Sequence, residues 1–178
     1  ITFGPAPTVD AGADQTLCGN NADAQLIGAV TIAGGGQWSG GNGTYPPSDQ
    51  SLSPVYTPSP TEILNGSVTL TLTTTDNAGC SPVTDDVTLT FTPSPTVDAG
   101  SDQSFCRNNA DIPLAGSVTV ATGGTWSGGT GTFNPDANTL NATYTPSLPE
   151  LLAGSVTLTL TSTGNGDCNS VSDDVTFT

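Results

Sequence analysis

Four cysteines are the residues of this chain whose chemistry is most open to a test. Cys18 and Cys80 are 62 positions apart, and Cys106 and Cys168 repeat that spacing. Four cysteines allow three pairings. The repeated spacing favours Cys18–Cys80 and Cys106–Cys168, because each half of the chain then closes its own bond. Each disulfide would stabilise its half by about 4 kcal/mol and would place the protein outside a reducing cytosol.

The four thiols could instead stay reduced or bind zinc, although the chain has no His and no Cys-x-x-Cys pair to favour a zinc site. A geometric condition also applies, because the Cα atoms of a disulfide lie within about 7 Å of each other. If the first strand ran the full height of a β-sandwich, Cys18 would end far from the last hairpin, where Cys80 lies. The pairing therefore requires a first strand that is short or kinked at Ala11-Gly12.

Aspartates gather at one expected end of the second half of the chain, and they are candidate calcium ligands. In an immunoglobulin-like sandwich the start of the first strand and the last hairpin share a pole, here beside a linker. Oxygen ligands from several loops suit Ca²⁺. The five candidates are Asp98, Asp102, Asp167, Asp173 and Asp174. Since no EF-hand motif is present, the alternative is that they are solvated acids of turns and edge strands, which limit aggregation.

The sequence contains no combination of residues that would act together in catalysis. Adjacent residues of a strand point to opposite faces, so the pairs Asp85-Asp86 and Asp173-Asp174 cannot act as acid and base across one substrate. A nucleophile would have no base, because His and Lys are absent. We therefore expect a protein that is not an enzyme and has no cofactor, with calcium as the one candidate ion.

The chain is strongly acidic, with a formal net charge of −15. This charge would repel nucleic-acid phosphates and anionic lipids, and no apolar run approaches the roughly 18 residues of a membrane helix. We expect neither nucleic-acid binding nor direct membrane insertion. Thr, Ser, Gly, Val and Leu dominate the remaining sequence in alternating patterns, which is typical of a folded β chain.

All these residues belong to a repeat of 88 positions. Pro7–Thr90 aligns without a gap onto Pro95–Thr178, and both copies contain Trp-Ser-Gly-Gly and Gly-Ser-Val-Thr-Leu-Thr-Leu-Thr. A period of this length indicates whole domains in series. We expect two modules, at 7–92 and 93–178, and residues 1–6 as the last strand of a preceding module.

Within one module the pattern predicts short strands and no helix beyond a single turn at 62–64. The expected strands of the first module are 8–18, 24–32, 37–39, 44–45, 51–56, 67–75 and 83–91. Val68, Leu70 and Leu72 alternate with Thr, so they should share the inner face. Strands of this number and length indicate an all-β fold, a tandem of immunoglobulin-like β-sandwich modules.

One tryptophan falls in each module, and two prolines separate the modules. Trp38 and Trp126 are predicted to be core residues, as in other immunoglobulin-like sandwiches. The alternative is that they form platforms on which sugars stack. Pro93 and Pro95 restrict the backbone of the linker, so we expect a stiff joint.

Three segments of the first module point to a known family of repeats. They are Pro-Thr-Val-Asp-Ala-Gly-Ala-Asp-Gln-Thr-Leu-Cys (7–18), Asn-Ala-Gly-Cys (77–80) and Asp-Asp-Val-Thr-Leu-Thr-Phe (85–91). Together they resemble the PKD-like repeats of very large secreted surface proteins of Bacteroidota. Both copies have Trp-Ser-Gly-Gly where typical PKD domains have Trp-Asp-Phe-Gly-Asp-Gly. The resemblance implies tandem PKD-like β-sandwiches displayed at the extracellular cell surface, in long adhesins that include gliding-motility adhesins.

Three functional hypotheses follow. The first is a stiff stalk segment of a large cell-surface adhesin or filament, which supports adhesion or surface motility and contacts neighbouring repeats of the same chain. The second is a module that binds surface glycans and gains avidity by repetition. The third is a fibre module that assembles with other copies of itself through the segment 1–6. Burial of Trp38 and Trp126 would favour the stalk.

Overall fold

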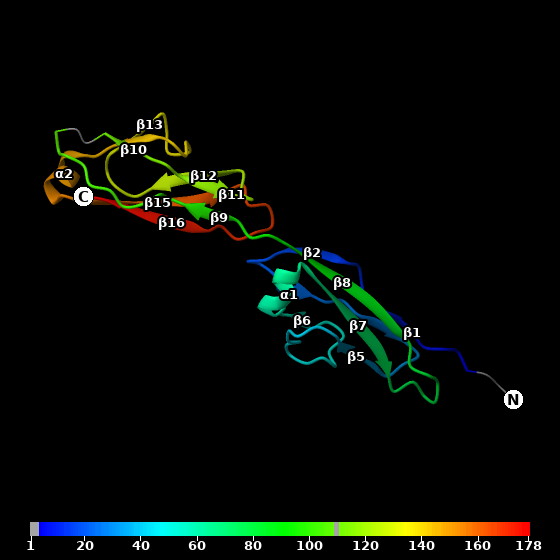
Figure 1. Cartoon of the computed structure of the whole chain (residues 1–178). Coiled ribbons are helices and arrows are strands. Elements are labelled where there is room, and N and C mark those ends of the chain that lie inside the picture. The colour runs from blue at the N-terminus through cyan, green and yellow to red at the C-terminus, as the bar shows by residue number, and fades with distance from the viewer. Residues whose placement is uncertain (1–3, 109–110) are drawn as a thin grey trace. The chain divides into compact units, whose positions relative to one another are not determined.

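The structure is a computed structural model that describes residues 4–108 and 111–178. It divides into two compact units, Ile1–Pro93 and Ser94–Thr178, which we call module 1 and module 2 (Figure 1). The sequence placed this boundary one residue earlier. Of the expected strand at 1–6, residues 1–3 lie outside the described residues and 4–6 belong to no strand.

Module 1 contains a four-stranded sheet with the order β2-β8-β7-β5. Its strands are β2 (Gln15–Cys18), β5 (Gly35–Ser39), β7 (Ser67–Thr75) and β8 (Thr84–Thr92). β7 and β8 pair antiparallel with Leu70 opposite Val87, whereas β2 runs parallel to β8 with Cys18 opposite Thr92. Because Thr alternates with apolar residues, the apolar side chains of β7 and β8 face inward, and Leu70 and Leu72 are fully buried.

Short strand pairs form the opposite layer of module 1. β1 (Thr8–Asp10) pairs with β4 (Ala29–Thr31), β3 (Ala24–Gln25) pairs with β6 (Val55–Tyr56), and the helix α1 (Pro60–Asn65) precedes β7. The expected first strand is therefore divided. The chain leaves this layer after Asp10, turns at Gly12, whose φ is 85°, and joins the other sheet as β2. The kink expected at Ala11-Gly12 is confirmed.

Module 2 repeats this order of elements, but its larger sheet has three strands, in the order β12-β15-β16. These strands are β12 (Gly123–Ser127), β15 (Val156–Thr163) and β16 (Ser172–Phe177). The other elements are β9 (Thr96–Asp98) paired with β11 (Ser117–Thr119), β10 (Ile112–Pro113) and β13 (Thr132–Asn134) both paired with β14 (Thr143–Thr145), and the helix α2 (Leu148–Ala153). In the described part of module 2, the counterpart of β2 is reduced to one parallel bridge between Gln103 and Phe177. No helix among the described residues has the length and apolarity to cross a membrane.

Each module has its own hydrophobic core between its two layers. Trp38 and Trp126 have exposed fractions of 1% and 2%, so the prediction that both are core residues is confirmed. Trp126 Nε1 donates to the Leu140 carbonyl (3.1 Å), whereas Trp38 Nε1 has no hydrogen-bond partner within residues 4–108 and 111–178. The two cores and the strand order confirm the all-β fold, a tandem of immunoglobulin-like β-sandwiches.

Candidate functional site

The structure contradicts the predicted cysteine pairing. Cys80 and Cys106 are free, exposed thiols, so neither the Cys18–Cys80 bond nor the Cys106–Cys168 bond is formed. Neither Cys18 nor Cys168 is a free thiol.

The pairing fails because the two cysteines of module 1 lie at opposite ends of one strand. Cys18 lies opposite Thr92, at the end of β8, whereas Cys80 lies in the hairpin before Thr84, where β8 begins. At about 3.3 Å per residue these ends are about 26 Å apart, and a disulfide requires less than about 7 Å between Cα atoms. The kink at Gly12 moves the chain to the other sheet, but it does not reverse its direction.

The calcium candidates of module 2 act mainly as acceptors for backbone hydrogen bonds. These bonds run from Gly100 N–H to Asp98 Oδ1 (2.8 Å), from Thr176 N–H to Asp102 Oδ1 (2.8 Å) and from Ala99 N–H to Asp173 Oδ2 (2.9 Å). Asp174 follows Asp173 on β16, and Asp167 lies in the preceding hairpin. Within the described ranges, no three acidic, His or Cys side chains gather as a metal site would require.

Module 1 has the same three bonds 88 positions earlier. They run from Gly12 N–H to Asp10 Oδ1, from Thr88 N–H to Asp14 Oδ1 and from Ala11 N–H to Asp85 Oδ2, all at 2.8 Å. Two of the three join the kinked segment 11–14 to β8, so they fix the place where the chain changes sheets. We call Asp14 and Asp85, with Asp102 and Asp173 in module 2, the aspartate staples.

Calcium binding stays a prediction for module 2. Asp167 has a glycine, Gly79, as its counterpart in module 1, so binding that uses Asp167 should stabilise module 2 alone. A ligand at a concentration equal to its Kd stabilises the folded state by about 0.4 kcal/mol. Thermal unfolding with and without millimolar Ca²⁺ measures this gain, and an unchanged midpoint would reject calcium binding.

A cluster of hydrogen bonds around a buried carboxylate was not predicted from the sequence. Glu62 in α1 has an exposed fraction of 4%. Its Oε1 accepts from the Tyr56 hydroxyl (2.7 Å) and from Asn42 N–H (2.7 Å), and its Oε2 accepts from the backbone N–H (2.7 Å) and hydroxyl (2.8 Å) of Ser59. The Tyr56 hydroxyl in turn accepts from Gly43 N–H (3.0 Å). We call this group the tyrosine–glutamate cluster.

The donors around Glu62 decide its charge. Burial raises the pKa of the Glu62 carboxyl, but the hydrogen bonds from Ser59, Tyr56 and Asn42 outweigh burial, so the pKa lies below its ordinary value. Burial and the bond to Glu62 raise the pKa of Tyr56. At neutral pH the cluster therefore holds an ionised Glu62 and a neutral Tyr56. It joins α1 to the glycine-rich loop and to β6.

Module 2 builds the same cluster. Glu150 accepts from Thr130 N–H (2.6 Å), Ser147 N–H (2.7 Å) and the Tyr144 hydroxyl (2.8 Å). Burial raises the pKa of Glu150 and the hydrogen bonds again outweigh it, whereas burial and the bond to Glu150 raise the pKa of Tyr144 to about 12. The cluster is thus a property of the repeat.

The tyrosine–glutamate cluster explains why the segment Trp-Ser-Gly-Gly contains glycine next to it. Gly41 has a φ of 67°, which side chains rarely adopt, and a Cβ there would overlap the Tyr56 hydroxyl. The counterpart Gly129 has the same φ and the same conflict with Tyr144. The sequence signal that could have revealed the cluster is the capping-box spacing of Ser59 and Glu62, which recurs at Ser147 and Glu150.

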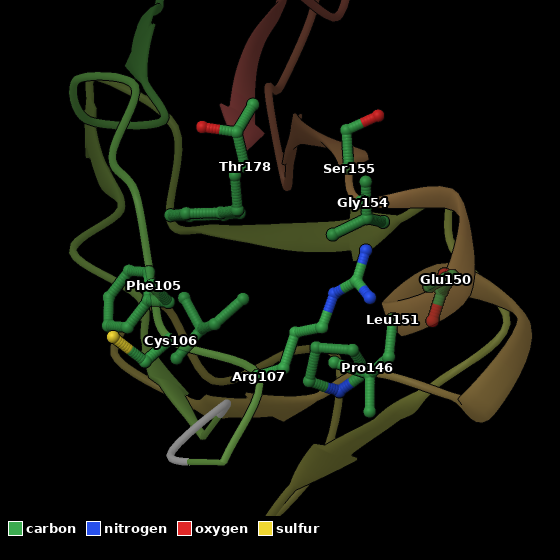
Figure 2. A pocket seen from close by; sticks show the side chains of 12 residues that line it. Phe105, Cys106, Arg107, Pro146, Glu150, Leu151, Gly154, Ser155 and Thr178 are labelled. Carbon is green, nitrogen blue, oxygen red and sulfur yellow. The ribbon is translucent and has the colours of Figure 1, made fainter.

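A pocket of about 140 Å³ lies at the end of module 2 where β16 ends (Figure 2). Buried apolar side chains line it, among them Ile112, Val156 and Phe177. Phe105 and the free thiol of Cys106 lie on one side, and Figure 2 shows Arg107 extending across the pocket toward Gly154. The pocket is thus mainly apolar, with the single cationic side chain of the chain beside it.

No protein-family model matches this chain, and no curated protein sequence matches it. Among solved structures, Drosophila N-cadherin EC1-4 is 11% identical over 97% of this chain and 49% of that chain, with a TM-score of 0.45. The titin I67–I69 structure is 12% identical over 98% and 66%, with a TM-score of 0.46, and human protocadherin-24 EC1-2 is 9% identical over 98% and 100%, with a TM-score of 0.44. The chain spans about half the length of the N-cadherin structure. By its own strand order and cores, the chain is a tandem of immunoglobulin-like β-sandwiches, and in general architecture it is similar to these structures.

Proposed function

We propose that this chain is a structural repeat segment, a stiff stalk, of a large secreted cell-surface adhesin or filament, where it supports adhesion or surface motility without enzymatic activity. The observation that carries the proposal is the nature of what recurs after 88 residues. The aspartate staples, the tyrosine–glutamate cluster and the buried tryptophan all recur, and each of them holds the fold together. Length is what such repetition provides.

The glycan-binding alternative loses its two tryptophans as candidate contacts. Trp38 and Trp126 lie inside the cores, with exposed fractions of 1% and 2%. A stacking platform needs an exposed aromatic face. A glycan array tests the alternative directly, because clear hits would favour a binding module over a stalk.

The stiffness of the joint can be measured by small-angle X-ray scattering of the two-module chain. A stalk predicts a narrow distribution of distances between the modules, because Pro93 and Pro95 restrict the backbone between them. Replacing both prolines by alanine should broaden the distribution. A distribution that is already broad for the natural sequence would contradict the stalk.

The repeat provides a matched control for this experiment. Pro5 and Pro7 precede module 1 as Pro93 and Pro95 precede module 2. Their double alanine variant removes the same number of prolines but leaves the joint intact. If it broadened the distribution as much as the joint variant does, the effect would come from destabilised modules.

A further inference from the structure

The sequence contains three Asn-Gly pairs, at 42–43, 65–66 and 165–166. In such a pair the glycine nitrogen can attack the side-chain carbonyl carbon of the asparagine, since glycine has no side chain to hinder the approach. The attack requires an asparagine side chain that can turn, because reacting atoms must first come within about 3–3.5 Å of each other. It also requires a base that accepts the proton of the glycine N–H. These two conditions distinguish the three pairs.

The Asn42-Gly43 pair meets both conditions. Asn42 is exposed in the loop 40–43, and within the part of the chain that the structure describes its side chain makes no hydrogen bond. Gly43 N–H donates to the Tyr56 hydroxyl (3.0 Å), and this hydroxyl donates to Glu62 Oε1 (2.7 Å). A proton can therefore pass from the Gly43 nitrogen to Tyr56 while Tyr56 passes its own proton to Glu62.

The other two pairs each fail one condition. Gly66 N–H donates to the backbone carbonyls of Glu62 and Ile63, both at 3.1 Å, and a peptide carbonyl oxygen accepts hydrogen bonds but is too weak a base to take up a proton at neutral pH. Asn165 Nδ2 donates to the Ser162 carbonyl (3.2 Å), and Asn165 Oδ1 is buried. The Asn165 side chain is thus held in place and cannot turn freely toward the nitrogen that follows it.

We propose that Asn42 is a site of self-modification, at which the Gly43 nitrogen attacks the Asn42 side chain while the Tyr56 hydroxyl accepts the proton of this nitrogen. A bond forms between the Gly43 nitrogen and Asn42 Cγ, and the bond from Cγ to Nδ2 breaks. Ammonia leaves with the proton that Glu62 has received through Tyr56. Water then opens the resulting succinimide ring and gives aspartate or isoaspartate at this position.

The reaction would loosen the tyrosine–glutamate cluster of module 1. Asn42 N–H donates to Glu62 Oε1 (2.7 Å), and the next N–H along the chain, that of Gly43, donates to Tyr56. An isoaspartate adds one carbon to the backbone between these two N–H groups, so they no longer reach both partners together. A sample of this protein would accumulate loosened first modules with age.

Module 2 has the same relay without the reactive side chain. Thr130 and Gly131 stand in the place of the pair. Gly131 N–H donates to the Tyr144 hydroxyl (2.8 Å), which donates to Glu150 Oε1 (2.8 Å). Because threonine has no side-chain amide, this module should stay unmodified and serves as an internal control.

Peptide mapping by mass spectrometry measures the reaction at each pair, in the folded chain incubated at neutral pH in heavy-oxygen water. Labelled aspartate and isoaspartate should accumulate at Asn42 before they appear at Asn65 and Asn165. In urea the three rates should become similar, because the contacts that distinguish the pairs are lost. If Asn42 reacted no faster than Asn165 in the folded chain, the proposal would be overturned.

Tyr56→Phe tests the proton relay, because it removes the hydroxyl but keeps the ring and the bond from Asn42 N–H to Glu62. The reaction at Asn42 should slow by about tenfold, less than a general base usually contributes, because the donors around Glu62 make it a weak base. Glu62→Gln should also slow it. A merely structural role predicts the opposite sign, since a loosened loop would turn more freely. A faster reaction in Tyr56→Phe would therefore reject the relay.

Thr130→Asn is the matched variant in module 2. It places an Asn-Gly pair on the relay of Tyr144 and Glu150, so the reaction should appear there at a rate similar to that of Asn42 and should slow when Tyr144→Phe is added. Asn42→Thr, the reverse change, should leave module 1 folded and unmodified, as hydrogen exchange of β7 and peptide mapping would show. A Thr130→Asn chain that formed product at Asn42 but none in module 2 would exclude the relay as the cause.

Discussion

The two modules share a core and a set of polar bonds, but they differ at one end. Module 1 has a four-stranded sheet in which β2 pairs with the last residues of β8, and Phe91 closes the core there. Module 2 has a three-stranded sheet, and its residues that correspond to β2 make one parallel bridge, between Gln103 and Phe177. Phe91 and Thr92, which follow the aligned repeat Pro7–Thr90, thus belong to module 1, as the expected bounds 7–92 placed them.

The largest expected effect tests the equivalence of the two cores. Trp38→Ala and Trp126→Ala should each lower the unfolding free energy of their own module by about 4 kcal/mol, because each removes a buried aromatic side chain. Hydrogen exchange of β7 and β15 amides reports each module separately. Trp→Phe at each position is the milder variant if a module fails to fold. A much smaller loss in one module would show that the cores are not equivalent.

The second prediction concerns the place where the modules differ. Phe91→Ala should destabilise module 1 by about 3 kcal/mol, although Phe91 lies at the edge of the linker, because a buried phenyl ring is removed. Module 2 should keep its stability, as measured by hydrogen exchange of β15. Thr90→Ala, at the exposed neighbour, is the control. If Phe91→Ala left module 1 unchanged, the linker would not be part of its core.

The third prediction compares the two tyrosine–glutamate clusters. Glu62→Gln should cost module 1 about 2 kcal/mol at pH 7, because bonds to a charged acceptor are replaced by bonds to a neutral one. Glu150→Gln should cost less, because Glu150 is only partly buried whereas Glu62 is buried. Urea unfolding with each module monitored by hydrogen exchange gives both values.

Acid titration then distinguishes charge from packing in these variants. The folded-state pKa of Glu62 is lowered, so its contribution to stability is present above the ordinary carboxyl pKa and is lost as the pH falls through the folded-state pKa. The difference between the natural chain and Glu62→Gln should therefore shrink in acid. A difference that stayed constant from pH 7 to pH 3 would show that packing, and not charge, is the cause.

The smallest expected effect concerns the aspartate staples. Asp85→Ala and Asp173→Ala should each destabilise their module by about 1 kcal/mol, since each removes one partly buried hydrogen bond to the backbone. Asp23→Ala, at an exposed aspartate, controls for the loss of one negative charge. If Asp23→Ala had the same effect, net charge would explain the loss and the staples would not be specific.

Strong alternation in the sequence predicted its strands well. The run of Thr with Val and Leu at 67–75 gave β7 with the bounds that the structure shows, and the single tryptophan of each module proved to be buried. Weaker patterns were less informative. The expected strand at 24–32 is divided into β3 and β4, which pair with different strands. In such cases the tertiary partners decide the pairing, and no local pattern encodes them.

The disulfide prediction was wrong because the sequence shows how far apart two cysteines are along the chain, but not where they lie in the folded sheet. Repeat symmetry suggested the Cys18–Cys80 bond, yet it contains no information on the end of the sheet at which each residue lies. The place of Phe91, by contrast, was predicted, since the expected strand 83–91 and the expected module 7–92 both contain it, and the structure buries it in the core of module 1. The spacing of Ser59 and Glu62 is a local signal, and it could have predicted the N-terminus of α1.

The parallel pairing of β2 with β8 has a mechanical consequence for module 1. β2 lies near the start of this module and β8 ends beside its last residue, and the two strands are joined over four residue pairs from Gln15 to Cys18. Tension applied along the chain would pull these strands past each other. The hydrogen bonds between them would then be sheared together, whereas a hairpin pulled from its open end loses its bonds one after another. Module 1 would therefore resist stretching through the parallel pairing of β2 with the last residues of β8.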